Sequence, residues 1–196
     1  MDKKPVKIVL VGSHGVGKTG LANALAAAFI ARNIHTYTIL ETARELLKQE
    51  PDIVKINEET TLKAQVRILE CQFQREIEAE KIPYDVIICD RSFDNYVYME
   101  RKFGSQQEYK DFILRHIIEH PYALIVKVPI VRNVLSYDGI RSTDLEFQKD
   151  IDVRLDRFMK KYGIKHLVLP EPVMPYREDW TYRIMNNLKS SLPRLV

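Results

Sequence analysis

Near the beginning of the chain lies the glycine-rich segment Gly12-Ser-His-Gly-Val-Gly-Lys-Thr19, from which the class of fold can be predicted. It matches the pattern Gly-x-x-x-x-Gly-Lys-Thr, in which successive backbone N–H groups surround the phosphates of a nucleotide. In that pattern Lys18 neutralises β- and γ-phosphate oxygens and Thr19 ligates Mg²⁺. The whole stretch is therefore expected to bind the nucleotide: Gly12, Ser13, His14, Gly15, Val16, Gly17, Lys18 and Thr19. For His14 we expect a solvent-exposed position with no chemistry of its own.

The residues around this stretch agree with a phosphate site. Four of the seven glycines lie between positions 12 and 20, and this clustering indicates a requirement of the backbone. A β-branched run at residues 6–11 precedes the stretch, and residues 21–29 carry apolar side chains at helical spacing. A helix beginning there points the positive end of its dipole at a bound anion. The sequence therefore predicts nucleotide binding rather than a glycine-rich turn that only joins a strand to a helix.

The rest of the chain alternates short β-branched runs with longer helical patterns. Such alternation is typical of α/β proteins, in which a parallel sheet lies between layers of helices. Five strands are expected, at residues 6–11, 35–40, 85–89, 123–128 and 166–169. After the first helix, further helices are expected at residues 57–81, 93–103, 106–119, 145–162 and 178–192. The predicted fold class is α/β, with a five-stranded parallel sheet flanked by helices.

Length and composition favour one compact domain covering residues 1–196. With 45% hydrophobic and 29% charged residues, the chain differs from disordered and fibrous proteins. The 30 Lys and Arg against 27 Asp and Glu give a net charge of +3, which indicates neither a nucleic-acid nor a membrane partner. Cys71 and Cys89 are not spaced as a metal or redox pair, and no apolar run reaches the roughly 18 residues of a membrane span. We therefore expect reduced core thiols and a cytoplasmic protein.

A second candidate site follows the strand expected at residues 85–89. That strand leads into Asp90 and Arg91 at its carboxyl end, the side on which ligands bind to open parallel sheets. Asp90 can hold the hydration shell of Mg²⁺ or orient a phosphate acceptor, and Arg91 can clamp an anionic or sugar oxygen. Alternatively, Asp90 caps the next helix and Arg91 forms a surface ion pair. The Asn-Lys-x-Asp and Asp-x-x-Gly segments of guanine-nucleotide switches are absent from the sequence, which argues against a small GTPase.

Together these motifs resemble the P-loop nucleoside and nucleotide kinases. The resemblance rests on the phosphate loop, Glu41 after the second strand, Asp90-Arg91-Ser92 after the third, and Asp138-Gly-Ile-Arg141 after the fourth. Within that superfamily the sequence looks most like the AAA-type ATPase/kinase group related to ribosylnicotinamide kinases, and more distantly like thymidylate and deoxynucleoside kinases. The resemblance implies the P-loop NTPase fold, with the strand before Asp90 lying between the first two strands. It also implies ATP as donor, Mg²⁺, and a small lid at about residues 129–143.

The resemblance gives the lid a catalytic role through Arg141. A lid of this kind swings an arginine over the transferring phosphoryl group, whose oxygens carry the charge of the transition state. Arg132 is a second lid arginine, and a solvated charged loop is the alternative for both residues. The acids that follow, at positions 144, 146, 150 and 152, are expected to be solvated on a helix with the i,i+4 pairs Asp150–Arg154 and Asp156–Lys160.

Glu41 bears on the identity of the acceptor. In deoxynucleoside kinases a glutamate at this place is the base that takes the proton from a sugar hydroxyl, whereas a phosphate acceptor needs positioning arginines such as Arg91. Glu41 is alternatively the cap of the following helical turn. On the helix expected at residues 57–81, Gln65 and Gln72 lie on one side, where their amides either read the edge of a base or border the core.

The function expected from the sequence is an ATP- and Mg²⁺-dependent phosphotransferase acting on a nucleoside, a nucleotide or a similar ribosylated small molecule. Its partners are a nucleotide donor and a small-molecule acceptor; the oligomeric state is left open. The expected catalytic residues are Lys18, Glu41, Asp90, Arg91 and Arg141, with Thr19 and Asp90 at the metal. One alternative is a nucleotide-dependent regulatory or adaptor protein without kinase activity. A polynucleotide 5′-hydroxyl kinase ranks third, because residues 20–31 contain no acid to serve as its catalytic Asp.

Overall fold

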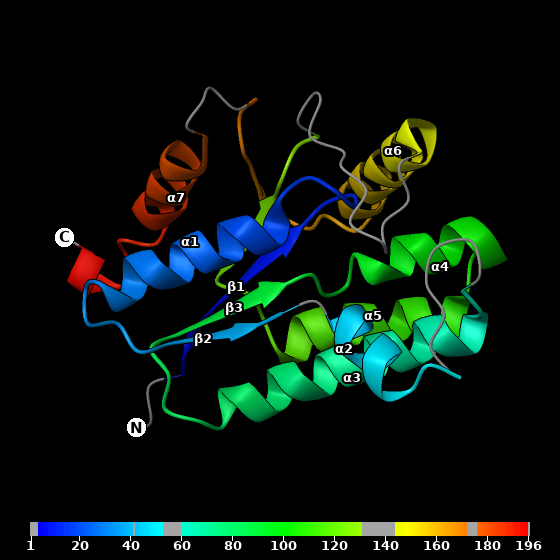
Figure 1. Cartoon of the computed structure of the whole chain (residues 1–196), viewed down its shortest axis with the longest axis horizontal. Helices are drawn as coiled ribbons and strands as arrows, with labels where there is room; N and C mark the ends of the chain where they lie inside the picture. The colour runs from blue at the N-terminus through cyan, green and yellow to red at the C-terminus, as the bar shows by residue number, and fades with distance from the viewer. Residues whose placement is uncertain (1–3, 41, 53–59, 131–143, 172–175, 196) are drawn as a thin grey trace.

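The computed structural model describes residues 4–40, 42–52, 60–130, 144–171 and 176–195, the side chains of 176 and 177 excepted. Strands and helices alternate along the chain (Figure 1). The strands are β1 (Val6–Val11), β2 (Thr36–Ile39), β3 (Val86–Asp90), β4 (Leu124–Lys127) and β5 (Leu167–Val168). The helices are α1 (Lys18–Ile30), α2 (Thr42–Gln49), α3 (Leu62–Glu80), α4 (Asn95–Phe103), α5 (Gln107–Glu119), α6 (Leu145–Lys161) and α7 (Tyr176–Asn187).

The five strands form one parallel sheet in the order β2-β3-β1-β4-β5. The expectation that the strand before Asp90 lies between the first two strands is therefore confirmed. In the register, Leu10 of β1 is opposite Asp90 of β3, and Val11 is opposite Lys127 of β4. The loop after β1 consequently leaves the sheet beside the ends of both neighbouring strands, where an open parallel sheet binds its ligands.

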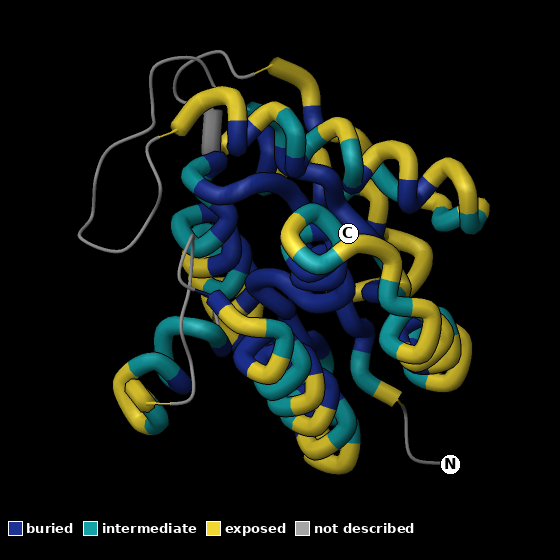
Figure 2. The backbone as a smooth tube through the Cα atoms, turned by 90° about the vertical axis from the view of Figure 1, so that its right-hand side faces the viewer, coloured by how far each residue is buried: buried dark blue, intermediate teal, exposed yellow. Residues whose placement is uncertain are grey.

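Helices cover both faces of the sheet. One core lies between the sheet and helices α1 and α7, and a second lies between the sheet and helices α3, α4, α5 and α6. In Figure 2 the central segments of the tube are dark blue, while the outward sides of the surrounding helices are yellow. All residues of β1 and β3 are buried, as the continuous apolar runs of a strand covered on both faces require.

The structure corrects the ends of two expected helices. Helix α3 begins at Leu62 rather than at residue 57, because the Thr61 side chain accepts a hydrogen bond from the Ala64 N–H and caps the helix. Helix α7 begins at Tyr176 and ends at Asn187, five residues before the expected end at Leu192. Both differences lie at helix termini, which fray and which apolar periodicity does not locate.

Two further expectations concern the whole chain. Neither Cys71 nor Cys89 forms a disulfide, and Cys89 is fully buried in the core of β3. In the parts of the chain that the structure describes, no helix combines the length and apolar character needed to cross a membrane.

Candidate active site

The loop between β1 and α1 approaches the neighbouring strand very closely. A Cβ atom on Gly12 would lie 2.7 Å from the carbonyl oxygen of Val128, and the φ of Gly12 is +151°. Gly17, the residue before α1, has a φ of +85° in the left-handed region. Side chains are disfavoured at both positions, so the glycines let the backbone turn from the strand into the helix while remaining close to the sheet.

Lys18 lies inside this loop and not on the surface. Its side chain is 5% exposed, and its Nζ donates hydrogen bonds to the carbonyl oxygens of Gly12 and Ser13, at 2.8 and 2.7 Å. The ammonium group is thereby held at the amino-terminal end of α1, where the helix dipole also favours an anion. This arrangement provides positive charge and backbone N–H groups at one place, as binding of nucleotide phosphates requires.

Thr19 and Asp90 meet at the end of the sheet. The Thr19 Oγ1 donates a hydrogen bond of 2.6 Å to Asp90 Oδ2, and Asp90 is 1% exposed. A hydroxyl and a carboxylate oxygen are hard ligands of the type that Mg²⁺ prefers, so this pair fits the ion that the fold implies. The alternative of Asp90 as helix cap is wrong, because the residue at the cap position of α4 is Asp94.

The side chain of Asp94, which was not among the expected site residues, connects the loop after β3 with the loop after β1. Its Oδ1 accepts from the Ser92 N–H at 2.9 Å and its Oδ2 accepts from the Gly12 N–H at 3.4 Å. The bond to Ser92 runs back to a residue two positions earlier in the chain, and the sequence gives no clear signal for it. The contact with Gly12 depends on the sheet order and had no sequence signal.

Arg91 is buried at the edge of this site. It is 9% exposed, its Nη2 donates to Tyr98 Oη at 3.3 Å, and its guanidinium carbon lies 4.9 Å from the centre of the Tyr98 ring. Arg91 therefore does not lie on the surface, as the alternative of a surface ion pair requires. The φ of Arg91 is +79°, a left-handed conformation that is rare for a residue with a side chain.

His14 is not solvent-exposed, contrary to the expectation. It is 6% exposed, with its ring centre 4.8 Å from that of Phe147 and 6.3 Å from that of Tyr98. Gln148, 2% exposed, donates a 2.7 Å hydrogen bond to the His14 carbonyl oxygen. The first turns of α6 therefore pack directly on the loop, a contact between residues 134 positions apart in the sequence.

The acids of α6 are only partly solvated. Asp150 pairs with Arg154 as expected, at 2.9 Å. Asp152 and Asp156, however, lie 3.1 and 2.6 Å from the Nζ of Lys127, which is buried at the end of β4. Burial raises the pKa of Asp152, although the charge of Lys127 acts in the opposite direction. The expected solvation of Asp152 is therefore wrong, because the sheet places a lysine beneath it.

Several expected site residues lie outside the described residues. They are Glu41, Arg132, Asp138 and Arg141, together with residues 131–143 of the lid expected at about residues 129–143. Of the two glutamines on α3, Gln65 is 7% exposed and donates from Nε2 to Thr60 Oγ1 at 2.8 Å. Gln72 is fully buried and hydrogen-bonded to other parts of the protein.

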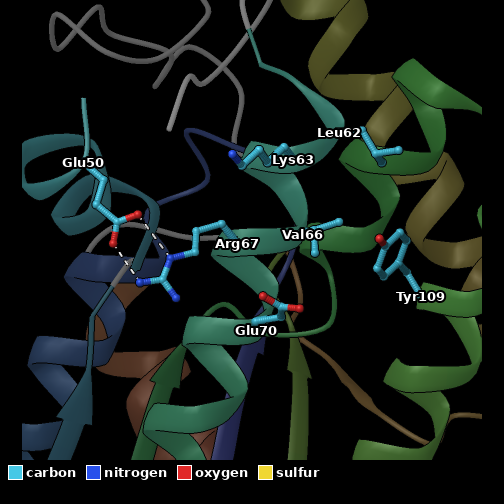
Figure 3. Close-up of a pocket in the computed structure, with 7 residues that line it drawn as sticks. All are labelled: Glu50, Leu62, Lys63, Val66, Arg67, Glu70 and Tyr109. Atoms are coloured by element: carbon cyan, nitrogen blue, oxygen red, sulfur yellow. Dashed lines mark hydrogen bonds and ion pairs between the residues drawn. The ribbon is translucent and has the colours of Figure 1, made fainter. Parts of the chain in front are cut away.

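A separate groove of about 420 Å³ lies between α3 and α5 (Figure 3). Leu62 and Val66 of α3 and Tyr109 of α5 form its apolar part. Arg67 makes a two-pronged ion pair with Glu50, at 2.7 and 3.1 Å, along its edge. None of the residues that line it belongs to the loop or to the strand ends, so the groove is distinct from the site.

Solved structures with the same fold include those of NadR and of a deoxyadenosine kinase. Crystal structures of NadR, one with NAD and AMP-PNP and one with NR, match with TM-scores of 0.70 and 0.72 at 16% and 17% identity. The matches cover 93% and 95% of this chain, which spans about half of the NadR chains (49% and 51%). Deoxyadenosine kinase from M. mycoides, with products dCMP and dCDP bound, matches with a TM-score of 0.63 at 16% identity over 94% of this chain and 99% of that chain.

The order of the strands and the loop between β1 and α1 are those of a P-loop fold, which these solved structures share. The sequence profile of a family described as an AAA domain matches residues 7–177. The chain therefore belongs to this AAA domain family. No curated protein sequence matches it.

Proposed function

We propose that this protein is an ATP- and Mg²⁺-dependent phosphotransferase that phosphorylates a nucleoside, a nucleotide or a similar ribosylated small molecule. The observation that carries the proposal is the 2.6 Å hydrogen bond between Thr19 and Asp90. It joins the loop that is built for nucleotide phosphates to a buried carboxylate at the ligand-binding edge of the sheet. The structural likeness to NadR and to deoxyadenosine kinase supports the choice of acceptor class.

On the donor side, the loop amides and Lys18 bind the β- and γ-phosphates. Thr19 Oγ1 and the carboxylate of Asp90 would hold Mg²⁺, which neutralises the charge of the transferring phosphoryl group when it is bound. When the nucleotide binds, the Nζ of Lys18 exchanges the carbonyl oxygens of Gly12 and Ser13 for phosphate oxygens. The new hydrogen bonds are stronger because both partners are charged.

On the acceptor side, Arg91 clamps an anionic or sugar oxygen of the acceptor, and Tyr98 supports its guanidinium group. Glu41 is the base that accepts the proton of an acceptor hydroxyl, and Arg141 closes over the donor; both roles are carried by the resemblance alone. A base is required only if the acceptor is a hydroxyl, because a phosphate is already an anion. We favour the hydroxyl.

The first experiment tests whether phosphoryl transfer occurs. The protein is incubated with ATP, Mg²⁺ and separate panels of nucleosides, monophosphates and ribosylated pyridines, and phosphorylated products are measured. In Lys18→Ala, turnover should fall by about a hundred- to thousandfold because an electrostatic stabiliser of the transition state is lost. Lys110→Ala, at a partly exposed position on α5, is the matched control. Nucleotide binding without any phosphorylated acceptor would instead indicate a regulatory nucleotide switch.

A second comparison identifies the acceptor group. Glu41→Gln keeps the shape of the side chain but cannot take up a proton, so turnover of a hydroxyl acceptor should fall by at least about a hundredfold. Arg91→Ala should be the more damaging change if the acceptor is a monophosphate, because a charge-assisted clamp is lost. Monophosphate turnover that tolerates Glu41→Gln but collapses with Arg91→Ala would overturn the hydroxyl assignment.

A further inference from the structure

Gln72 uses both ends of its side-chain amide to join two separate elements. Its Oε1 accepts a 2.5 Å hydrogen bond from the hydroxyl of Thr42, the first residue of α2. Its Nε2 donates to the carbonyl oxygen of Arg91 at 3.1 Å and to Glu76 Oε1 at 3.0 Å. A carbonyl and a carboxylate can only accept, so the amide nitrogen must face them, and both of its protons are used.

This amide therefore has no donor left to read the edge of a base. Its two N–H groups and its oxygen are all engaged by the protein, and the side chain is 0% exposed. Presenting Nε2 to a ligand would leave the Arg91 carbonyl and the buried Glu76 carboxylate with one partner fewer, and such losses destabilise a folded protein.

The bond from Gln72 acts on the most unusual backbone conformation of the site. Arg91 has a φ of +79°, and a residue with a side chain persists there only when its surroundings hold it. The peptide that follows Arg91 is fixed on one side by Gln72 through its carbonyl oxygen, and on the other by Asp94, which accepts from the Ser92 N–H. The direction in which the Arg91 side chain leaves the backbone follows from this peptide.

Glu76 fixes Gln72 in turn. It lies one helical turn further along α3 and is fully buried, and its carboxylate also accepts from Ser92 Oγ at 2.5 Å and from Tyr122 Oη at 2.8 Å. A carboxylate with several donors has little freedom to move. Helix α3 thus carries a rigid pair, Gln72 and Glu76, that touches both Arg91 and Ser92 at the end of β3.

We propose that Gln72 is a positioning residue of the phosphotransferase, which sets the distance from the start of α2 to Arg91 and so orients the guanidinium group of Arg91 toward the acceptor. This inference deepens the proposed function and rests on it. Gln72 touches neither donor nor acceptor, and its effect is expected chiefly on the acceptor side, because its three hydrogen bonds go to α2, to α3 and to Arg91, and none of them reaches the phosphate loop directly.

The test uses Gln72→Met, which keeps the length of the side chain and removes all three hydrogen bonds. Displacement of a reacting group by about 1 Å is enough for a loss of roughly a hundredfold, so kcat/KM for the acceptor should fall by about ten- to a hundredfold. The KM for ATP should stay within about twofold, because the contacts of Lys18 and Thr19 are unchanged. If Gln72→Met impairs the KM for ATP as strongly as kcat/KM for the acceptor, the positioning role is wrong.

Gln74→Met is the matched control. Gln74 is the same residue type on the same helix and also donates to an acid four residues later, Glu78 at 2.9 Å, but it is exposed and lies away from the strand ends. Its substitution should leave both constants at the wild-type value. If Gln74→Met lowers acceptor turnover as much as Gln72→Met does, the effect belongs to α3 in general and the proposal fails.

Thr42→Val is a second test, because it removes the hydrogen bond between Thr42 and Gln72 but leaves the buried amide of Gln72 in place. It should lower acceptor kcat/KM less than Gln72→Met, with an unchanged KM for ATP. The double variant should be no worse than Gln72→Met alone, because the two residues act through one hydrogen bond and their effects are not additive. If the losses in acceptor kcat/KM of the two single variants add up in the double variant, the two residues do not act through one hydrogen bond and the proposal fails.

Hydrogen exchange separates this proposal from the proposed function. In the nucleotide-free protein, Gln72→Met should speed amide exchange of Ser92 by about tenfold or more, since the turn opens locally, while Gln74→Met should not. This readout needs no acceptor, so it still decides the proposal if wild type phosphorylates nothing in the panels. Unchanged exchange at Ser92 would overturn the proposal even in an active kinase.

Discussion

Arg91 shows how one residue can depend on several distant ones. Its identity is visible in the sequence, directly after the acid at the end of a buried strand. Its left-handed backbone, its burial and its contact with Tyr98 are properties of the folded chain. Lys18 behaves similarly, because the motif names it but the loop carbonyls hold it in place. At the scale of the residue, the sequence identifies the chemical groups and the fold determines their conformation.

The two cysteines differ in burial, and this difference can be tested by their reactivity. Cys89 is fully buried and its pKa is raised well above the ordinary value, first by burial and then by the charge of Glu76. Cys71 is half-buried on α3. A thiol reagent at pH 8 should therefore react with Cys71 in the folded protein and with Cys89 only after unfolding, since the thiolate is the reactive form. Cys71→Ser should abolish the early phase of labelling; a remaining early phase would contradict the burial of Cys89.

At the scale of the element, helix α3 connects the expected fold with the unexpected contacts. Its apolar stripe predicts a helix packed on the sheet, and Leu69 and Phe73 are indeed buried there. The same helix turns Gln72 and Glu76 toward the strand ends, although polar residues beside an apolar stripe ordinarily face solvent. The first residue of the helix is set by Thr61, whose hydroxyl caps it.

Removing that cap should weaken α3 measurably. Thr61→Ala leaves the Ala64 N–H without its side-chain partner and should lower the free energy of unfolding by about 1 kcal/mol. Thr61→Ser retains the hydroxyl and should restore most of the loss. Urea unfolding followed by circular dichroism measures both variants. Equal stability of Thr61→Ala and wild type would show that the helix does not depend on this cap.

At the scale of the whole molecule, a buried polar cluster connects the two ends of the sheet. Glu76 receives hydrogen bonds from His116 and Tyr122, and the Nζ of Lys7 lies 3.4 Å from its Oε2. Burial alone would raise the pKa of Glu76, but the bond from His116 and the charge of Lys7 outweigh it and hold the pKa below 4.5. A fully buried carboxylate is tolerated only with such partners.

This cluster should make the protein sensitive to acid. Because the pKa of Glu76 is lower in the folded than in the unfolded protein, the unfolded state binds more protons below about pH 4.5, and stability falls as the pH decreases through that range. Glu76→Gln should lower the unfolding free energy at pH 7 by about 3 kcal/mol, as expected for one broken partner of a buried ion pair. It should also flatten the fall in acid.

Urea unfolding at a series of pH values from 7 to 3 measures both effects. Glu78→Gln, on the exposed side of the same helix, is the control and should keep the wild-type dependence on pH. Identical pH profiles for Glu76→Gln and wild type would mean that other carboxylates are responsible for the loss of stability in acid.

The class of fold and the position of the glycine-rich loop follow from the sequence alone. Continuous apolar runs, helical stripes and the glycine-rich stretch are local patterns, and each residue in them acts through near neighbours in the chain. The five strands, the parallel sheet and the loop from Gly12 to Thr19 were therefore predictable. The end of β3 was recognisable too, because a buried strand that stops at Asp90 leaves that acid at the ligand-binding edge.

The contacts that hold these groups in place are visible only in the folded protein. The burial of His14 against Phe147, the pairing of Lys127 with Asp152, and the bridge from Thr42 through Gln72 to Arg91 all join elements that are distant in sequence. A side-chain amide or a carboxylate has no preference of its own for these partners; it pairs with them because sheet order and helix packing bring them together and leaving them unpaired in the interior is unfavourable. Such pairings depend on the whole fold, and no local pattern encodes them.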